Sequence, residues 1–134
     1  MDHTALKQII DKIPELKYKF IGTFPADFIP NLVRSTFCII NTDNSSQPGE
    51  HWIMVANYNG TLYYGDSMGK PIHHYSNFKR FNKMKKLTSD RMQNSPQLCG
   101  FYCVYFAWVL FKLHQKHVSD TQDVHVLRFI SNFM

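Results

Sequence analysis

Cys99 stands where a polar stretch gives way to an apolar one, in QNSPQLCGFYCVYFAWVLF from Gln93 to Phe111. The residues after Cys99 are apolar on every face of a helix, so we expect a buried helix that begins at this cysteine. The first turn of a helix has unpaired backbone N–H groups and a partial positive charge, which favour a thiolate over a thiol. Cys99 is therefore placed as a nucleophile would be; the alternative is a small core residue.

A base and an orienting carboxylate for this thiol are predicted at the end of a β-hairpin. The segments HWIMVANY (51–58) and TLYYGDS (61–67) flank Asn59-Gly60, the strongest short signal for a two-residue turn. The turn fixes a register in which His51 and Asp66 are diagonal neighbours on one face, within reach of each other. An inconsequential surface pair is the alternative. His51, however, begins a strand that is apolar on both faces and is therefore expected to be interior.

An amide side chain shortly before Cys99 completes the set that a cysteine hydrolase needs. In such an enzyme the thiolate attacks a carbonyl, the imidazolium protonates the leaving amine, and a side-chain amide with the backbone N–H of the cysteine holds the oxyanion. Gln93 and Gln97 are the two candidates. Gln97 lies only two residues before Cys99 and would have to fold back sharply, so Gln93 is preferred.

The remaining cysteines indicate the compartment and exclude a metal site. Cys38, Cys99 and Cys103 cannot all pair within one chain, which favours a reducing compartment over a disulfide scaffold. Cys38 lies in an apolar, β-branched run and is interpreted as a core residue. Cys99 and Cys103 share a helix face, but no neighbouring His or Cys completes a metal-ligand set, so no metal is expected.

Length and composition predict one folded unit. The 134 residues are 44% hydrophobic, enough for a single core, and we expect one domain over residues 1–134. The amino terminus lacks the basic region of a signal peptide, and no run of about 18 apolar residues follows. The chain is therefore expected neither to be exported by that route nor to span a membrane.

The elements expected around the site are short helices and strands, with irregular chain where prolines occur. In chain order they are a helix over 4–12 capped by Thr4, an extended segment at 18–21, a strand at 36–42, the hairpin, a short strand at 86–92, the helix that begins at Cys99, and a last helix over 121–133. Asp120 or Thr121 is expected to cap the last helix. Its apolar stripe is predicted to be Val124, Leu127 and Ile130.

The formal net charge of +5 is concentrated in one segment, where basic residues alternate with aromatic ones. The segment is predicted to be helical, and either a solvated helix face or a contact with nucleic acid or another polyanion explains it. Its basic residues are Lys79, Arg80, Lys83, Lys85 and Lys86, interleaved with Phe78 and Phe81.

Three motifs together resemble the adenovirus protease family. They are GEHW at 49–52, GDS at 65–67 and the Q-x5-CG spacing from Gln93 to Gly100, in the order His, acid, Gln, Cys. The resemblance covers roughly residues 20–111, and Cys103 also matches a cysteine common in that family. Relatives occur in other large DNA viruses and virus-like transposons, and the wider clan includes the proteases of SUMO and other ubiquitin-like proteins.

The resemblance implies a role for each of six residues: Cys99 as nucleophile, His51 as general base, Asp66 as its orienter, Gln93 as oxyanion donor, and Trp52 and Gly100 in the substrate cleft. It implies an α+β, papain-like (ubiquitin-like-protease) fold in which the helix that carries the cysteine packs on a mixed or antiparallel sheet. It further implies a thiol-dependent cysteine endopeptidase, a hydrolase that cleaves viral capsid and core precursors at glycine-containing sites during virion maturation.

The expected setting follows from the same resemblance. The chemistry needs no cofactor, DNA or a viral peptide is the suggested activator, and the partners are protein substrates and DNA, with no membrane and a monomeric chain. The expected location is the virion and the infected host cell, in the nucleus or a cytoplasmic factory. The adenovirus protease is longer, and its activating peptide is disulfide-linked. No cysteine lies between Cys38 and Cys99 here, so a tethered peptide at the usual place is not expected.

Two alternative functions stay open at this point. The first keeps the chemistry but acts on conjugates of ubiquitin-like modifiers, although a short chain offers little surface for docking a folded modifier. The second is a basic DNA- or virion-binding protein with an inactive protease fold. Reactivity of Cys99 distinguishes the second alternative from both proteases.

Overall fold

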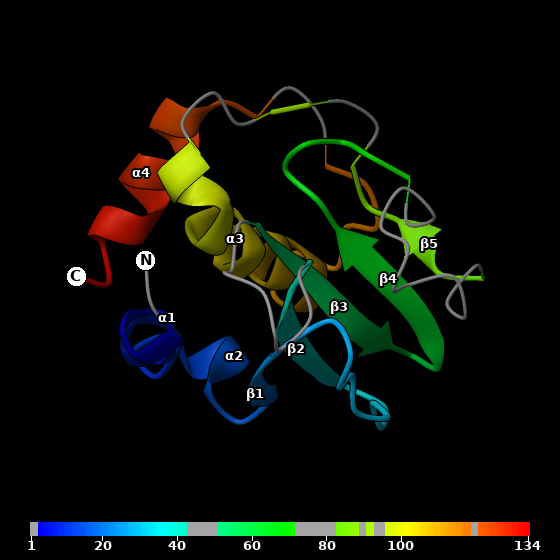
Figure 1. Cartoon of the computed structure of the whole chain (residues 1–134). Helices are drawn as coiled ribbons and strands as arrows, with labels where there is room; N and C mark the ends of the chain where they lie inside the picture. Colours follow the sequence, from blue (N-terminus) through cyan, green and yellow to red (C-terminus); the bar gives the residue numbers. More distant parts are fainter. Residues whose placement is uncertain (1–2, 43–50, 72–82, 89–90, 93–95, 119–120) are drawn as a thin grey trace.

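The protein has a mixed α+β architecture, in which a five-stranded sheet is covered on one face by a central helix (Figure 1). The computed structural model describes residues 3–42, 51–71, 83–88, 91–92, 96–118 and 121–134. Its elements are α1 (His3–Ile10), α2 (Pro14–Lys17), β1 (Phe20–Phe24), β2 (Thr36–Asn41), β3 (Trp52–Tyr58), β4 (Thr61–Gly65), β5 (Lys85–Lys86), the 3-10 turn η3 (Pro96–Leu98), α3 (Cys99–Phe111) and α4 (Asp123–Ser131).

The sheet is mixed and its strands follow chain order, β1-β2-β3-β4-β5. β2, β3 and β4 are antiparallel, whereas β1 runs parallel to β2 and β5 runs parallel to β4. The β3–β4 hairpin has the predicted register, with Tyr58 opposite Thr61. Its turn residues Asn59 and Gly60 have φ of 54° and 87°, as a two-residue hairpin turn of this kind requires.

The two faces of the sheet contribute to two separate cores, because successive side chains of a strand point to opposite faces. In β2, Phe37 and Ile39 pack in the core shared with α3, while Cys38 and Ile40 pack in the second core. Ala26 and the partly buried Leu32 contribute to that second core, from the segment between β1 and β2. The sheet is therefore buried on both sides, which explains the almost continuous apolar runs of its central strands.

Helix α3 is the most buried element, as the sequence predicts. Eleven of its 13 residues are buried, so packing must surround the helix rather than cover one stripe. The sheet lies on one side of α3, and α1, α2 and α4 contact it from the others (Figure 1). None of the described helices is both long enough and apolar enough to cross a membrane.

The predicted apolar stripe of the last helix is confirmed for Ile130 and wrong for its other two residues. Val124 and Leu127 are 51% and 46% exposed, and the buried residues of α4 are Val126 and Ile130. Phe129 decides the orientation, since its ring lies 5.0 Å from that of Trp108, between centroids, against α3. The start of the helix also differs, because Gln122 is the N-cap.

Gln122 and His125 form a reciprocal capping box, in which the Gln122 backbone N–H donates to His125 Nδ1 over 3.0 Å. The predicted caps Asp120 and Thr121 are therefore wrong. The first helix likewise starts one residue early, at His3, so Thr4 lies within α1 and is not its cap.

The helix predicted for the basic segment is wrong for its described part. Lys83 lies in a turn, and Lys85 and Lys86 form strand β5. The open edge of β4 explains this outcome, because its backbone groups need partners and the Leu87 N–H donates to the Tyr64 carbonyl over 2.9 Å. This need for backbone partners outweighs the favourable helix propensity of lysine. The predicted 86–92 strand is reduced to the end of β5 and a bridge between Thr88 and Val118, among the residues described.

Candidate active site

His51 and Asp66 meet at the open end of the β3–β4 hairpin, as the predicted register requires. His51 Nε2 and Asp66 Oδ1 are 2.6 Å apart. The side chains are 13% and 0% exposed, so the alternative of a surface pair is wrong. The last paired residues of the ladder are Met54 and Gly65. The pair therefore lies just past the end of the sheet, where backbone groups are available to hold it.

The Asp66 carboxylate is held by the backbone of the turn that follows it. Oδ1 accepts the Met68 N–H over 2.9 Å, and Oδ2 accepts the Lys70 N–H over 3.3 Å. The Gly69 N–H donates to the Asp66 carbonyl over 2.9 Å, with φ of 67° at Gly69. A buried carboxylate needs several hydrogen bonds to be tolerated. Here they also fix the oxygen that faces the imidazole.

Cys99 is the first residue of α3, as predicted, and is 5% exposed. Burial raises the pKa of its thiol, but the hydrogen bond to His51, the backbone N–H of Trp52, the positive charge of His51 and the backbone N–H of Gly100 all lower it. The net effect is a pKa below the ordinary value. The thiolate is thus stabilised by one imidazole and two backbone amides.

His51 shows the complementary change. Burial lowers the pKa of its imidazole, whereas the hydrogen bonds to Asp66 and Cys99 and the charges of both partners raise it, to about 9. Since Nε2 is held by Asp66, Nδ1 is the ring nitrogen left for the sulfur. A lowered thiol pKa and a raised imidazole pKa define a pH range in which thiolate and imidazolium coexist.

The other two cysteines lack this environment. Burial raises the pKa of Cys38 to about 12. Burial also raises the pKa of Cys103 well above its ordinary value, and the charges of Cys99, Asp66 and Cys38 add to the effect. Cys99 alone among the three cysteines has a lowered pKa, and no cysteine is in a disulfide. The surroundings therefore favour a thiolate at Cys99 and the protonated thiol at Cys38 and Cys103.

Of the two predicted cleft residues, Trp52 belongs to β3 and Gly100 to α3. Trp52, the first residue of β3, is partly buried and packs against the core shared with α3. Gly100 is buried, and a Cβ on it would lie 3.0 Å from Leu6 Cδ2. Gly100 therefore allows α1 to approach the start of α3. The contribution of these two residues to a substrate cleft stays a prediction.

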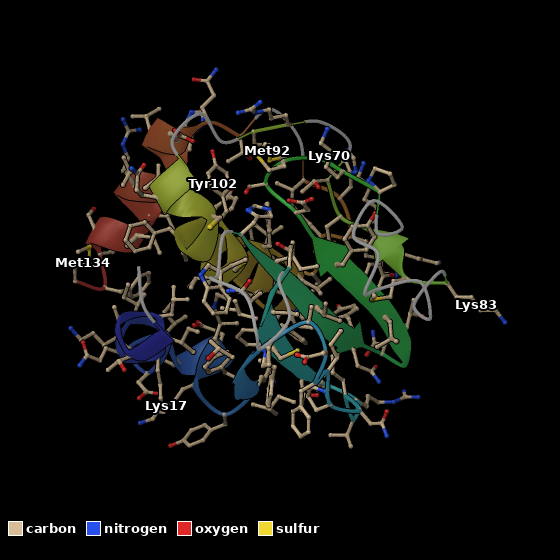
Figure 2. All side chains as sticks on the ribbon, viewed as in Figure 1. Lys17, Lys70, Lys83, Met92, Tyr102 and Met134 are labelled. Atoms are coloured by element: carbon tan, nitrogen blue, oxygen red, sulfur yellow. The ribbon has the colours of Figure 1, made fainter. Side chains whose placement is uncertain are left out.

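The remaining predicted residues are Gln93 and the five basic ones. Gln93, Lys79 and Arg80 lie outside the described residues. Lys83 and Lys85 are exposed, and Lys83 projects outward from the edge of the molecule beyond β5 (Figure 2). Lys86, by contrast, is half-buried and donates from Nζ to the Gly69 carbonyl over 2.6 Å. One of the basic residues therefore contacts the turn that carries Asp66.

Sequence reasoning predicted that backbone N–H groups of the first helical turn would stabilise the thiolate, as the Gly100 N–H does, but it missed the Trp52 N–H and the support of Asp66. No residue type signals the Trp52 amide, because its position depends on how the hairpin meets α3. Thr88, whose hydroxyl bonds the Asp66 carbonyl, falls within the predicted 86–92 strand but has no motif of its own. Within the described part of the chain, no three His, Cys, Asp or Glu residues gather closely enough to hold a metal ion.

The arrangement is suited to nucleophilic attack by sulfur. It joins a buried carboxylate, an imidazole and a thiol at a helix start, from elements that are distant in sequence. Comparisons with known proteins add nothing to this geometry: no protein-family model matches the chain, and no curated protein matches it either.

Proposed function

We propose that this protein is a cysteine endopeptidase, with Cys99 as nucleophile, His51 as general base and Asp66 as the residue that orients it. One observation carries the proposal: the imidazole of His51 lies between a buried carboxylate at 2.6 Å and a thiol whose pKa is lowered. A structural cysteine has no need of such a partner. Strongly perturbed pKa values with specific charge partners are typical of catalytic groups.

The chemistry follows from the two ring nitrogens. The Cys99 thiolate attacks the carbonyl carbon of the scissile peptide, and the C–N bond breaks as the His51 imidazolium transfers its Nδ1 proton to the leaving amine. The resulting thioester is hydrolysed by a water molecule that gives a proton to Nδ1, which releases the acid and restores the thiolate–imidazolium pair. Asp66 holds Nε2 throughout and stabilises the imidazolium.

An oxyanion forms twice in this cycle and needs donors. We assign this role to the backbone N–H of Cys99, at the start of α3, and to the side-chain amide of Gln93. The helix start supports the first assignment, since backbone N–H groups and the helix dipole favour negative charge there. The second rests on the Q-x5-CG spacing alone.

The substrate class is proposed from the sequence resemblance. GEHW, GDS and Q-x5-CG support a papain-like arrangement as in the adenovirus protease family, and with it cleavage of viral capsid and core precursors at glycine-containing sites. The corresponding setting is the virion and the infected cell, with DNA or a viral peptide as activator. The mixed sheet with the cysteine-bearing helix packed on it is compatible with this fold.

Hydrolysis of fluorogenic peptides with Gly-Gly or X-Gly before the cleaved bond tests the proposal. Cys99→Ala and His51→Ala should each abolish hydrolysis while circular dichroism shows an intact fold. Cys38→Ala is the matched control, since it removes another buried thiol, in the core on the other face of the sheet. An active Cys99→Ala protein would overturn the proposal.

Two further outcomes identify the alternatives. Faster turnover of a ubiquitin-family fluorogenic substrate than of the Gly-Gly peptide indicates a deconjugating protease. Salt-sensitive DNA binding with a Cys99 that resists alkylation at all pH values, with and without added DNA, indicates a nucleic-acid-binding protein with an inactive site.

A further inference from the structure

Buried polar residues are concentrated beside the catalytic pair. Asp66, Ser67 and Thr88 are three of the four residues, tyrosine and cysteine aside, that are buried and polar or charged in the described part of the chain; Thr121 is the fourth. Asp66 and Ser67 follow β4, whereas Thr88 follows β5, 22 residues further along. Burial of polar groups is costly unless they are hydrogen-bonded, so this cluster indicates specific contacts between the two segments.

Three described residues that follow in the chain each donate a hydrogen bond to the turn after β4. Thr88 Oγ1 donates to the Asp66 carbonyl over 2.8 Å, the Met92 N–H donates to the Ser67 carbonyl over 2.8 Å, and Lys86 Nζ donates to the Gly69 carbonyl over 2.6 Å. Figure 2 labels Lys70, in the turn, and Met92 at the top of the view. The turn that carries Asp66 is therefore held from outside as well as by its own backbone.

Thr88 itself is fixed on both sides. The preceding residue, Leu87, donates its N–H to the Tyr64 carbonyl of β4 over 2.9 Å and accepts the Val118 N–H over 2.8 Å. Thr88 also bridges to Val118, beyond the end of α3. Its side chain is 1% exposed. The hydroxyl thus extends from a rigid backbone toward the carbonyl of the residue that contacts the imidazole.

We propose that Thr88 is a positioning residue for the catalytic pair, holding Asp66 through its backbone carbonyl so that the carboxylate meets His51 Nε2. This inference rests on the proposed function, since it assumes that the His51–Asp66 pair serves catalysis. Thr88 is not itself a catalytic residue, because its hydroxyl bonds the backbone and not the reacting groups. Such supporting contacts fix the geometry that a catalytic hydrogen bond needs.

Thr88→Val isolates the hydroxyl, because valine has nearly the same shape. The Asp66 carbonyl keeps the Gly69 N–H as a donor, so the turn can persist without being held at the same place. Among the described residues, the ionisable groups that act on the imidazole are Asp66 after β4 and Cys99 on α3, and the Lys86 ammonium lies on the Gly69 carbonyl. None of these is altered by the substitution, so any change at His51 is transmitted through the position of Asp66.

The experiment measures catalysis and the state of His51 separately. Peptide hydrolysis gives kcat and KM for the wild type, Thr88→Val and Thr88→Ser. NMR titration of His51 is done in a Cys99→Ala background, where Asp66 is the remaining charged partner of the imidazole.

For Thr88→Val we expect kcat about 10-fold lower with KM unchanged, less than the roughly 100-fold that a misplacement of about 1 Å can cost. The His51 pKa should fall, and Thr88→Ser should restore both. Thr121→Val controls for the loss of a buried threonine hydroxyl elsewhere.

Each result has one meaning. A Thr88→Val protein with wild-type kcat and wild-type His51 titration overturns the inference, as does a lower kcat with unchanged His51 titration, which would indicate a merely structural role. Failure of the proposed function is distinct: the wild-type protein would cleave no peptide. The His51 titration would still respond to Thr88→Val if the hydroxyl positions Asp66.

Discussion

Cys99 and Cys103 lie one turn apart on α3, and the structure gives them opposite acidities. The pKa of Cys99 is lowered and that of Cys103 is raised well above its ordinary value, although both thiols are buried. Burial acts in the same direction on both. The difference is that Cys99, at the helix start, has His51 and the Trp52 and Gly100 amides as partners, whereas burial and neighbouring negative charge both disfavour a thiolate at Cys103.

The comparison shows that position along the helix decides the chemistry, more than residue type does. The first turn of α3 leaves backbone N–H groups for the sulfur, while the second turn has its amides used within the helix. His51 and the Trp52 N–H, at the end of the hairpin, act on Cys99 in the first of these turns. Cysteine is therefore a candidate nucleophile at position 99 and a core residue at position 103, one turn later.

The largest expected difference between the two positions appears when each sulfur is removed in turn. Cys99→Ala should lower kcat/KM by about 10⁴-fold or more, since removal of a nucleophile leaves only binding and oxyanion stabilisation. Cys103→Ala should keep most activity and lose stability by about 1 kcal/mol, for a buried group slightly reduced in size. Peptide hydrolysis and thermal unfolding measure the two. Equal loss of activity in both variants, with both folded, would contradict the distinction.

The second effect concerns Asp66, which holds the imidazole that Cys99 has as a partner and Cys103 lacks. Asp66→Asn keeps the shape of the side chain but removes the charge that stabilises the imidazolium and can reverse the hydrogen-bonding role at Nε2. We expect kcat to fall by roughly 10² to 10⁴-fold, the range attributed to a positioned acid or base. Iodoacetamide alkylation of Cys99, followed by mass spectrometry, should also require a higher pH. Unchanged alkylation would show that Asp66 does not act on the pair.

The third effect is the pH range of the thiolate–imidazolium pair. Activity should rise with pH through the lowered pKa of Cys99, because the thiol must lose its proton, and should fall again near pH 9, where the imidazolium that protonates the leaving amine is lost. The profile of kcat/KM reports these values for the free enzyme and belongs to the coupled pair. An alkaline limb near pH 6.5 would mean that Asp66 and Cys99 leave the acidity of His51 unaltered.

The parts of this site that local sequence encodes could be predicted. Asn59-Gly60 sets the hairpin register, which brings His51 to Asp66 over a separation of 15 residues, and the apolar run after Cys99 defines the buried helix. Both depend on patterns within a few neighbouring residues. The polar-to-apolar boundary at Cys99 likewise marks the start of the helix.

The parts that depend on distant partners were predicted wrongly or missed. Lys85 and Lys86 form a strand because the edge of β4 accepts one, and Thr88 matters because it reaches the Asp66 carbonyl. Val124 is exposed because Phe129 turns the other face of α4 toward Trp108. Each outcome is decided by a residue on another element, which no local pattern contains. The oxyanion role of Gln93 stays a prediction.

The smallest effect tests how α3 packs on the hairpin, because this packing sets the position of Cys99 relative to His51. A Cβ on Gly65 would lie 2.9 Å from Phe106 Cγ and nearer still to Cδ2, so Gly65→Ala must push the helix from the end of β4. Overpacking of this kind costs about 1 to 3 kcal/mol. Gly100→Ala is the matched comparison, because its Cβ would meet only the flexible end of Leu6, at 3.0 Å. Thermal unfolding should show the larger loss for Gly65→Ala.

The two glycine variants also distinguish a change in the position of α3 on the sheet from a loss of stability. If the position of α3 on the sheet matters for the Cys99–His51 pair, Gly65→Ala should shift Cys99 alkylation to higher pH even where the protein remains folded. The reason is that the His51 end of the hairpin and the start of α3 would move apart. Gly100→Ala, at the helix start but facing α1, should leave the alkylation profile nearly unchanged. Equal profiles for the two variants would mean that the Cys99 environment is set by the first turn of the helix alone and not by its contact with the sheet.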